Sequence, residues 1–155
     1  MENLSKLEEN IGYKFKNISL LKNALTHTSY AYENKVASNE KLEFLGDSIL
    51  EFLSSKYIYN NYPMLKEGEM TKVRATVVCE ESLYKIASKH NFSDFLYVGK
   101  SEKMHQGNRK VAIMADSVEA VIAAIYFDSG LEQAEKFIIE NLKDEIKIAT
   151  QNVGQ

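Results

Sequence analysis

Acidic residues recur at helical spacing within one short segment of the chain, EKLEFLGDSILEF, which covers residues 40–52. These acids are separated by three, four and four residues, and they are Glu40, Glu43, Asp47 and Glu51. A helix would project all four carboxylates in one narrow stripe, and each like-charged pair would cost it about 0.2–0.5 kcal/mol. Such a stripe is typical of a solvated acidic face, yet a site for a hard divalent cation would need the same arrangement. The segment alone leaves both interpretations open.

A second pair of acids interrupts an otherwise apolar segment, VAIMADSVEAVIAAIYFDSG, at residues 111–130. Asp116 and Glu119 are three residues apart and would share one face of a helix. An ionised carboxylate is costly to bury without a partner, so the pair needs either a cation or basic side chains. A structural salt bridge would satisfy one such pair. Two acidic pairs on two core-like helices also allow four carboxylates to meet at one point.

The chemistry of such a meeting point follows from its ligand atoms. Several carboxylate oxygens, with water at the remaining positions, suit Mg²⁺ or Mn²⁺ better than zinc. Magnesium held by carboxylates is widely used to hydrolyse phosphodiesters, because the metal generates hydroxide and stabilises the leaving oxygen. The residues by themselves therefore indicate a metal-dependent enzyme that acts on phosphoryl groups.

The elements that position these acids are predicted to be helices. Helical periodicity extends along the chain, and no segment alternates between apolar and polar residues as a half-buried strand would. The predicted fold class is all-α. Asn39 is the predicted N-cap of the third helix, and Gly130 ends the fifth. In chain order, the predicted helices cover residues 3–11, 18–26, 40–60, 67–90, 111–127 and 131–149, and residues 91–110 are predicted to be irregular.

Length, charge and cysteine content limit the class of protein. A chain of 155 residues suits one domain with a proper core. Its formal net charge of -3 argues against binding nucleic acid through bulk positive charge, so any phosphate-binding surface must be local. Cys79 is the only cysteine, which excludes an internal disulfide, and its apolar neighbours predict a buried, unreactive thiol. With neither a secretory signal nor an apolar run of membrane-spanning length, we expect a cytoplasmic protein without membrane contact.

The segment NEKLEFLGDSIL at residues 39–50 closely resembles a motif of the ribonuclease III family, whose usual form is NERLEFLGDS followed by an apolar pair. The similarity continues, in the family's order, through ALTHTSY at 24–30, EGEMTKVRATVV at 67–78 and ADSVEAVIAAIYFDSG at 115–130. The departures are mild: one lysine replaces an arginine, and Ser-Val follows the aspartate where an Ala-Phe-like pair is commoner. Neither removes an acid.

The resemblance assigns roles to individual residues. The matching catalytic and metal-binding carboxylates are Glu43, Asp47, Asp116 and Glu119. Glu40 and Glu67 match acids with a supporting or RNA-contacting role. Phe44 matches an aromatic residue that the family inserts into a pocket of the partner subunit. Glu51 has no catalytic counterpart, and we interpret it as solvated.

The resemblance also implies an activity. The family hydrolyses phosphodiester bonds in double-stranded RNA, such as rRNA and mRNA precursors, and leaves 5′-phosphate and 3′-hydroxyl ends with 3′ overhangs. It implies a helical endonuclease domain that forms a homodimer and uses Mg²⁺, with Mn²⁺ as a substitute and no small-molecule cofactor. Residues 1–150 would form this domain and 151–155 the start of a linker or tail. The double-stranded-RNA-binding domain usual in bacterial members is absent from this sequence.

Two other classes of protein could also have such a fold or such carboxylates. A catalytically silent relative, acting as an RNA-binding or ribosome-associated protein, would be recognisable by lost acids, and none is lost here. An all-α magnesium-dependent nucleotide hydrolase would use paired carboxylates but would not explain FLGDS. His27 is predicted to make a structural hydrogen bond at a helix end. The basic residues that could contact phosphates, or be plain surface charges, are Lys72, Arg74, Arg109 and Lys110.

Overall fold

The computed structural model describes residues 3–153, and this part of the chain is helical with no β-strand. One isolated bridge joins Thr26 to Tyr97. The helices are α1 (Leu4–Ile11), α2 (Ile18–Ala24), α3 (Thr28–Asn34), α4 (Glu40–Asn61), α5 (Glu67–Val77), α6 (Glu80–Lys89), α7 (Lys100–Met104), α8 (Val111–Ser129) and α9 (Leu131–Asn152), with 3₁₀ turns η1 (Phe92–Asp94) and η2 (Gly107–Arg109). The predicted all-α class is confirmed.

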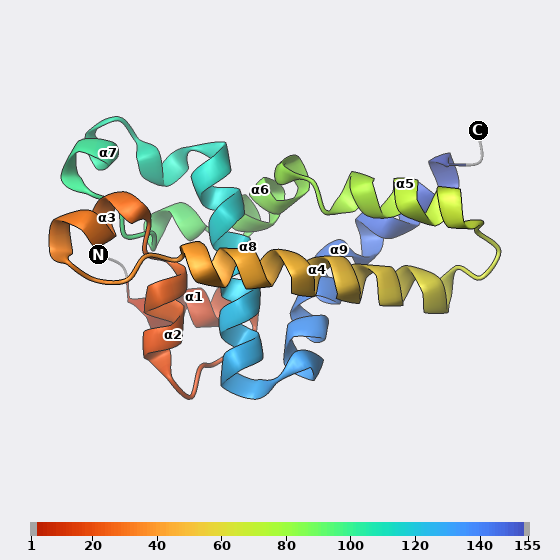
Figure 1. Cartoon of the computed structure of the whole chain (residues 1–155), viewed down its shortest axis with the longest axis horizontal. Coiled ribbons are helices and arrows are strands. Elements are labelled where there is room, and N and C mark those ends of the chain that lie inside the picture. Colours follow the sequence, from red (N-terminus) through yellow and green to blue (C-terminus); the bar gives the residue numbers. More distant parts are fainter. Residues whose placement is uncertain (1–2, 154–155) are drawn as a thin grey trace.

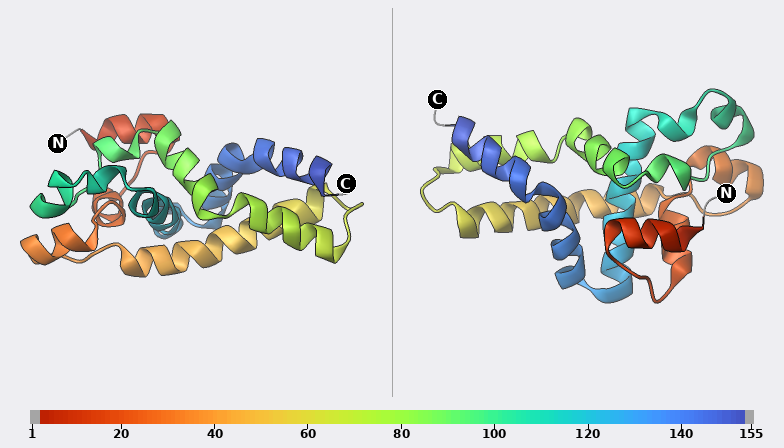
Figure 2. Two further views of the ribbon diagram at one scale, coloured as in Figure 1. Left: turned by 90° about the horizontal axis from the view of Figure 1, so that it is seen from above. Right: turned by 180° about the vertical axis from the view of Figure 1, so that it is seen from behind.

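Helix α8 is the centre of the fold. Most of its residues between Met114 and Ile125 are buried. The helices that pack against it are α2, α4, α6 and α9. Helix α4 crosses α8 and runs along one long face of the molecule, whereas α1 and α9 lie on the opposite side (Figures 1 and 2). The two helices that contain the acidic pairs are therefore in direct contact. Gly130, at φ 94°, ends α8 as predicted.

The prediction of a single helix over residues 67–90 is wrong. The chain forms α5 and α6 instead, and the break falls at Val78 and Cys79. Cys79 has extended backbone angles, φ -72° and ψ 164°, and precedes a first turn that contains Glu80 and Glu81. Acidic residues stabilise a helix N-terminus through the helix dipole, which favours a new helix at this point.

This break also overturns the prediction for the cysteine. Cys79 is exposed rather than buried, because it lies in the turn between two helices and not inside one. Its Sγ donates to the carbonyl of Thr76 at 3.3 Å.

Two further helices were not predicted. Helix α3 follows α2 closely, and α7 lies within the segment 91–110 that was predicted to be irregular. At the other end of the chain, α9 continues to Asn152, beyond the predicted end at 149, and residues 154–155 of the predicted tail lie outside the described residues. No helix in the described part of the chain is long and apolar enough to cross a membrane.

Candidate metal centre

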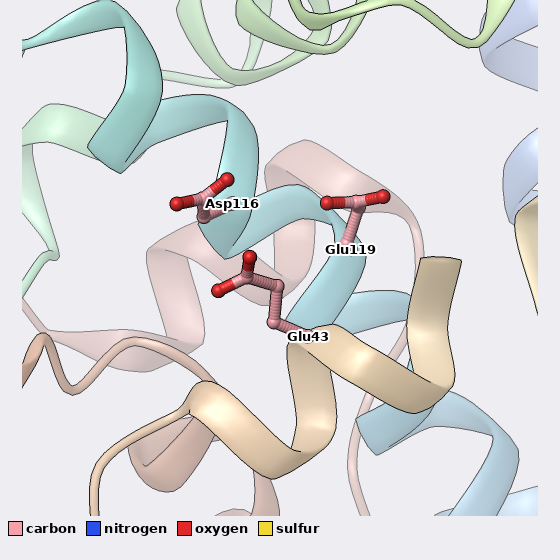
Figure 3. A group of neighbouring side chains, drawn as sticks. All are labelled: Glu43, Asp116 and Glu119. Atoms are coloured by element: carbon pink, nitrogen blue, oxygen red, sulfur yellow. The ribbon is translucent and has the colours of Figure 1, made fainter. Parts of the chain in front are cut away.

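Three of the predicted carboxylates meet where α4 crosses α8. Glu43 extends from α4, and Asp116 and Glu119 extend from α8 (Figure 3). Each residue offers one oxygen, and the three oxygens lie within 4.8 Å of one another. All three side chains are half-buried. A cluster of carboxylate oxygens this close is a suitable ligand set for a hard divalent cation.

The fourth predicted carboxylate borders this cluster. Asp47 lies one helical turn after Glu43 and is exposed. The side chain of Asp47 is a hydrogen-bond partner of Glu119. The side chain of Asp116 is likewise a hydrogen-bond partner of Glu43. The acids thus form two linked pairs, each joining α4 to α8, and Asp47 marks the side of the cluster that is open to solvent.

The close approach of the two helices depends on Gly46. A Cβ atom added at this position would overlap the backbone carbonyl of Glu119, so α4 and α8 can touch here only because residue 46 has no side chain. Gly46 lies between Glu43 and Asp47 in the sequence. The same glycine therefore sets the distance between the acids of α4 and those of α8.

The cluster has an excess of negative charge that the described residues do not neutralise. Burial, together with the charges of Asp116 and Glu40, raises the pKa of Glu43 to about 7. Burial, hydrogen bonding to Asp47 and the neighbouring negative charges raise the pKa of Glu119 to about 9. The pKa of Asp116 is also raised, by burial and by Glu80. Crowded acids of this kind retain protons unless a cation replaces them.

A structural salt bridge does not account for these acids. Within residues 3–153, the ion pairs are Lys56–Glu135, Arg74–Glu51, Lys85–Glu81 and Lys110–Glu102. None of them includes a member of the cluster. The composition and electrostatics of the cluster therefore fit a divalent metal better than a basic side chain.

The remaining predicted residues lie in different places. Glu40 is exposed at the first residue of α4, close enough to Glu43 to raise its pKa. Glu67 begins α5, near the far end of α4 (Figure 1). There it borders a hollow of about 480 Å³, which we call the α4–α5 hollow and which is lined by residues including Phe52, Ser55, Tyr59, Glu67, Met70 and Arg74.

Glu51, interpreted as solvated, is partly exposed, and it also takes part in an ion pair at the surface. Its carboxylate pairs with Arg74 at 3.1 Å, and the same guanidinium donates to Ser55 at 3.0 Å. The turn of α5 back along α4 brings the two charges together, which the sequence of α4 alone could not indicate. Among the predicted phosphate-contacting residues, Lys72 and Arg109 are exposed, and Lys110 pairs with Glu102 at 2.7 Å.

Asn39 occupies the N-cap position of α4, as predicted, but its side chain makes no capping hydrogen bond. It is buried, and its Nδ2 donates to the carbonyl of Ala24 at 2.9 Å. Its backbone N–H donates to the carbonyl of Thr26, also at 2.9 Å, and its own carbonyl accepts from Glu43. Asn39 therefore fastens the start of α4 to the end of α2, four residues before Glu43.

This role gives the first testable prediction. Asn39→Asp retains a good N-capping side chain but replaces the donor to Ala24 with an acceptor, so the folded chain should lose about 1–3 kcal/mol of stability. Asn3→Asp is the matched control, because Asn3 is a true N-cap whose Oδ1 accepts from the backbone of Ser5 at 3.0 Å. Urea denaturation should show a large loss for Asn39→Asp and little change for the control. Equal effects would contradict the role assigned to Asn39.

Two residues near the cluster were not identified from the sequence. Glu80 opens α6 and is close enough to Asp116 to raise its pKa, but the expected continuous helix hid this position. Gly46 was recognisable only as part of a motif. A glycine inside a long helical pattern could have indicated a close helix contact.

Comparison with known proteins defines the class to which this fold and site belong. The family model described as Ribonuclease-III-like matches residues 17–146, and the chain belongs to this family. Ribonuclease 3 of Clostridium perfringens is 48% identical over 145 residues, which cover 93% of this chain and 61% of the relative. Ribonuclease 3 of Clostridium beijerinckii is 45% identical over 150 residues, which cover 96% of this chain and 65% of the relative. The chain thus spans somewhat less than two thirds of the length of these relatives.

Solved structures give the same result. A nuclease domain of ribonuclease III from Campylobacter jejuni matches with a TM-score of 0.86 and 36% identity, over 92% of this chain and 98% of that domain. It is described as having structural flexibility in a region involved in dimer formation. A second structure of that nuclease domain also has a TM-score of 0.86, at 37% identity.

Proposed function

We propose that this chain is the nuclease portion of a ribonuclease III, which hydrolyses phosphodiester bonds in double-stranded RNA and leaves 5′-phosphate and 3′-hydroxyl ends with 3′ overhangs. Residues 1–150 would form the catalytic domain, acting on rRNA and mRNA precursors in the cytoplasm. The main support is the convergence of half-buried carboxylates without a basic partner in the described residues of a member of this family. A catalytically silent relative would have no reason to keep this costly cluster.

The proposed ligands of the cation are Glu43, Asp47, Asp116 and Glu119. Mg²⁺ is the proposed ion and Mn²⁺ a substitute, since carboxylate oxygens suit both. When bound, the ion would supply an activated water and stabilise the leaving oxygen. These residues would hold the ion between α4 and α8, whose close approach depends on Gly46. Exposed Glu40 and Asp47 would face the approaching RNA, which the acids alone would repel.

A homodimer is the proposed assembly. Phe44 is 79% exposed, directly beside Glu43 on the long outer helix. The aromatic side chains at the α4–α5 hollow, Phe52 and Tyr59, are also mainly exposed. A two-fold axis near the middle of α4 would pair this helix with the partner's α4 in an antiparallel arrangement. The start of each α4 would then lie beside the later part of the other. Phe44 would therefore pack against the partner's α4–α5 hollow. The partner's Glu67 would then lie beside this acidic cluster.

The dimer gives the second prediction. Phe44→Ala should weaken dimerisation by about 3–5 kcal/mol, the usual cost of removing a well-buried aromatic side chain. Analytical ultracentrifugation of the wild type and the variant would measure the shift in dissociation constant. Tyr32→Ala is a matched control, since Tyr32 is 88% exposed and belongs to α3, outside α4 and the α4–α5 hollow. A wild-type chain that stays monomeric at micromolar concentration would contradict the proposed assembly.

The test of the activity is incubation of a long RNA duplex with the chain, with and without Mg²⁺, followed by mapping of the product ends. We expect cleavage only with the cation, 5′-phosphate and 3′-hydroxyl termini, and staggered cuts. Intact duplex in the presence of Mg²⁺, or products with 2′,3′-cyclic phosphate ends, would refute the proposed function.

A further inference from the structure

His27 forms the N-cap of α3, as the predicted structural hydrogen bond required. Its Nδ1 accepts from the backbone N–H of Ser29 at 3.1 Å and lies 2.8 Å from the Oγ of Ser29. That Oγ in turn accepts from the backbone N–H of Gly99 at 2.8 Å. Ser29 of α3 thus fixes the Nδ1 edge of the half-buried imidazole, and Gly99, before α7, fixes the hydroxyl of Ser29.

This chain of hydrogen bonds selects one form of the ring. Because Nδ1 accepts from the backbone N–H of Ser29, it has a lone pair there and no hydrogen, and the hydroxyl of Ser29 can also donate to it. Nδ1 is then an acceptor only, and the neutral imidazole has its proton on Nε2. Among residues 3–153, Nε2 of His27 has no hydrogen-bond partner. The protein therefore orients an N–H donor that it does not use.

The unused donor lies beside the acidic cluster, because the residue before His27 is bonded to the start of α4. The carbonyl of Thr26 accepts from the backbone N–H of Asn39 at 2.9 Å, and the carbonyl of Asn39 accepts from that of Glu43, also at 2.9 Å. Burial and Glu80 raise the pKa of Asp116, and the nearby His27 acts in the opposite direction. On the other side, a hydrogen bond from Lys110 lowers the pKa of Glu102, and His27 contributes to that shift. The imidazole donates a hydrogen bond to neither Asp116 nor Glu102.

We propose that His27 is a substrate-binding residue whose Nε2–H donates to a non-bridging phosphate oxygen of the RNA strand held beside the acidic cluster. This inference rests on the proposed function. A donor fixed by backbone contacts suits the phosphate backbone, which presents the same anionic oxygen in every sequence. The contact would hold the strand in register with the cluster without selecting bases.

Because His27 also caps α3, the test must separate the two roles. His27→Asn does so, since asparagine is among the best N-caps and can still accept from Ser29, but it is too short to place a donor at the position of Nε2. His105→Asn is the matched control: His105 is exposed at the end of α7, and its Nδ1 lies 2.9 Å from the carbonyl of Ser101. Thermal melting with and without Mg²⁺ would verify that both variants fold and respond to the cation as the wild type does.

The measured quantity is binding of a short RNA duplex with Ca²⁺ in place of Mg²⁺, followed by cleavage with Mg²⁺. We expect His27→Asn to weaken duplex binding about tenfold, as the loss of a hydrogen bond to a charged group would, with unchanged melting. The effect should be equal for duplexes of unrelated sequence. Wild-type binding and cleavage by His27→Asn would leave only the capping role and overturn the inference. A lost response to Mg²⁺ would also overturn it, because His27 would then act through Asp116.

A measurement on the unaltered chain does not depend on the variant folding. The protein has three histidines, so long-range ¹H–¹⁵N spectra can resolve each ring. We expect His27 to be protonated at Nε2 and to shift when duplex RNA is added, whereas His105 does not. A proton on Nδ1, or no shift at saturating RNA, would overturn the inference. A chain that binds duplex RNA with this shift but never cuts it would refute the proposed function and leave the His27 contact supported.

Discussion

Replacing Glu119 with glutamine should reduce cleavage of double-stranded RNA at least about a hundredfold, because loss of a residue that merely supports a metal ligand already costs 10–100-fold. Glutamine keeps the shape of the side chain and removes its charge. The variant should therefore fold and keep most of its RNA binding. Glu119 is the most informative position, since its pKa, raised by burial and by Asp47 to about 9, is the most strongly perturbed in the cluster.

The control for this substitution is Glu9→Gln, which alters an exposed glutamate on α1. Initial cleavage rates at saturating Mg²⁺, with circular dichroism to monitor folding, would compare the two variants with the wild type. Glu9→Gln should cut at the wild-type rate. Undiminished cleavage by Glu119→Gln would show that the carboxylates of this cluster do not serve the reaction.

Gly46→Ala should destabilise the chain by about 1–3 kcal/mol, even though alanine is the better helix former by about 1 kcal/mol. The added methyl group would overlap the backbone carbonyl of Glu119, and backbone cannot move aside as a flexible side chain can. The helices would have to separate. Because Glu43 and Asp47 flank this contact on α4, the variant should also respond more weakly to Mg²⁺.

Gly68→Ala provides a close comparison in a neighbouring helix. Gly68 lies in the first turn of α5, and a Cβ atom there would meet nothing within 4 Å. This variant should be neutral or more stable than the wild type by up to about 1 kcal/mol. Urea denaturation of both variants gives the comparison. Equal stability for Gly46→Ala and Gly68→Ala would contradict the close contact of α4 and α8.

The sequence predicted α4 and α8 closely, because both are long and periodic and end near residues that interrupt a helix. It failed between Val77 and Glu80, where neither glycine nor proline marks the break between α5 and α6. The separation is made by tertiary packing, since α6 lies against α8 while α5 runs back to α9. The acidic residues Glu80 and Glu81 are the local signal for a new helix start, but the direction of each helix depends on packing that local patterns do not contain.

The sequence predicted which residues form the site, but it did not predict how exposed each of them is. The spacing of the acids indicated which residues would share a face, and the resemblance indicated which of them to expect together. Neither could show that Asp47 is exposed while Glu43 is half-buried, since this depends on how α4 crosses α8. Asn39 likewise had the residue type of an N-cap, but its partner is a carbonyl at the end of α2, fifteen residues earlier.

The raised pKa values predict a specific dependence of stability on pH. Burial and neighbouring acids bring the pKa of Glu43 to about 7 and that of Glu119 to about 9, against an ordinary value of 4.5. The folded chain therefore holds protons that the unfolded chain has lost. Without a divalent cation, the contribution of these two groups to stability should be greatest at low pH and should decline as the pH rises from about 4.5 through about 7 to about 9. Thermal melting in the presence of a chelator would measure this decline, and a melting temperature that rises across the range would contradict it.

A titration of the melting temperature with Mg²⁺ shows whether the carboxylates on α4 and α8 form a site for a divalent cation. A specific site predicts stabilisation that saturates with Mg²⁺ concentration, grows as the pH is raised from about 6 to about 8, and is much reduced in Glu119→Gln. A solvated acidic face predicts a diffuse salt effect instead. A weak, non-saturating increase, equal in the wild type and in Glu119→Gln, would show that these carboxylates form no cation site.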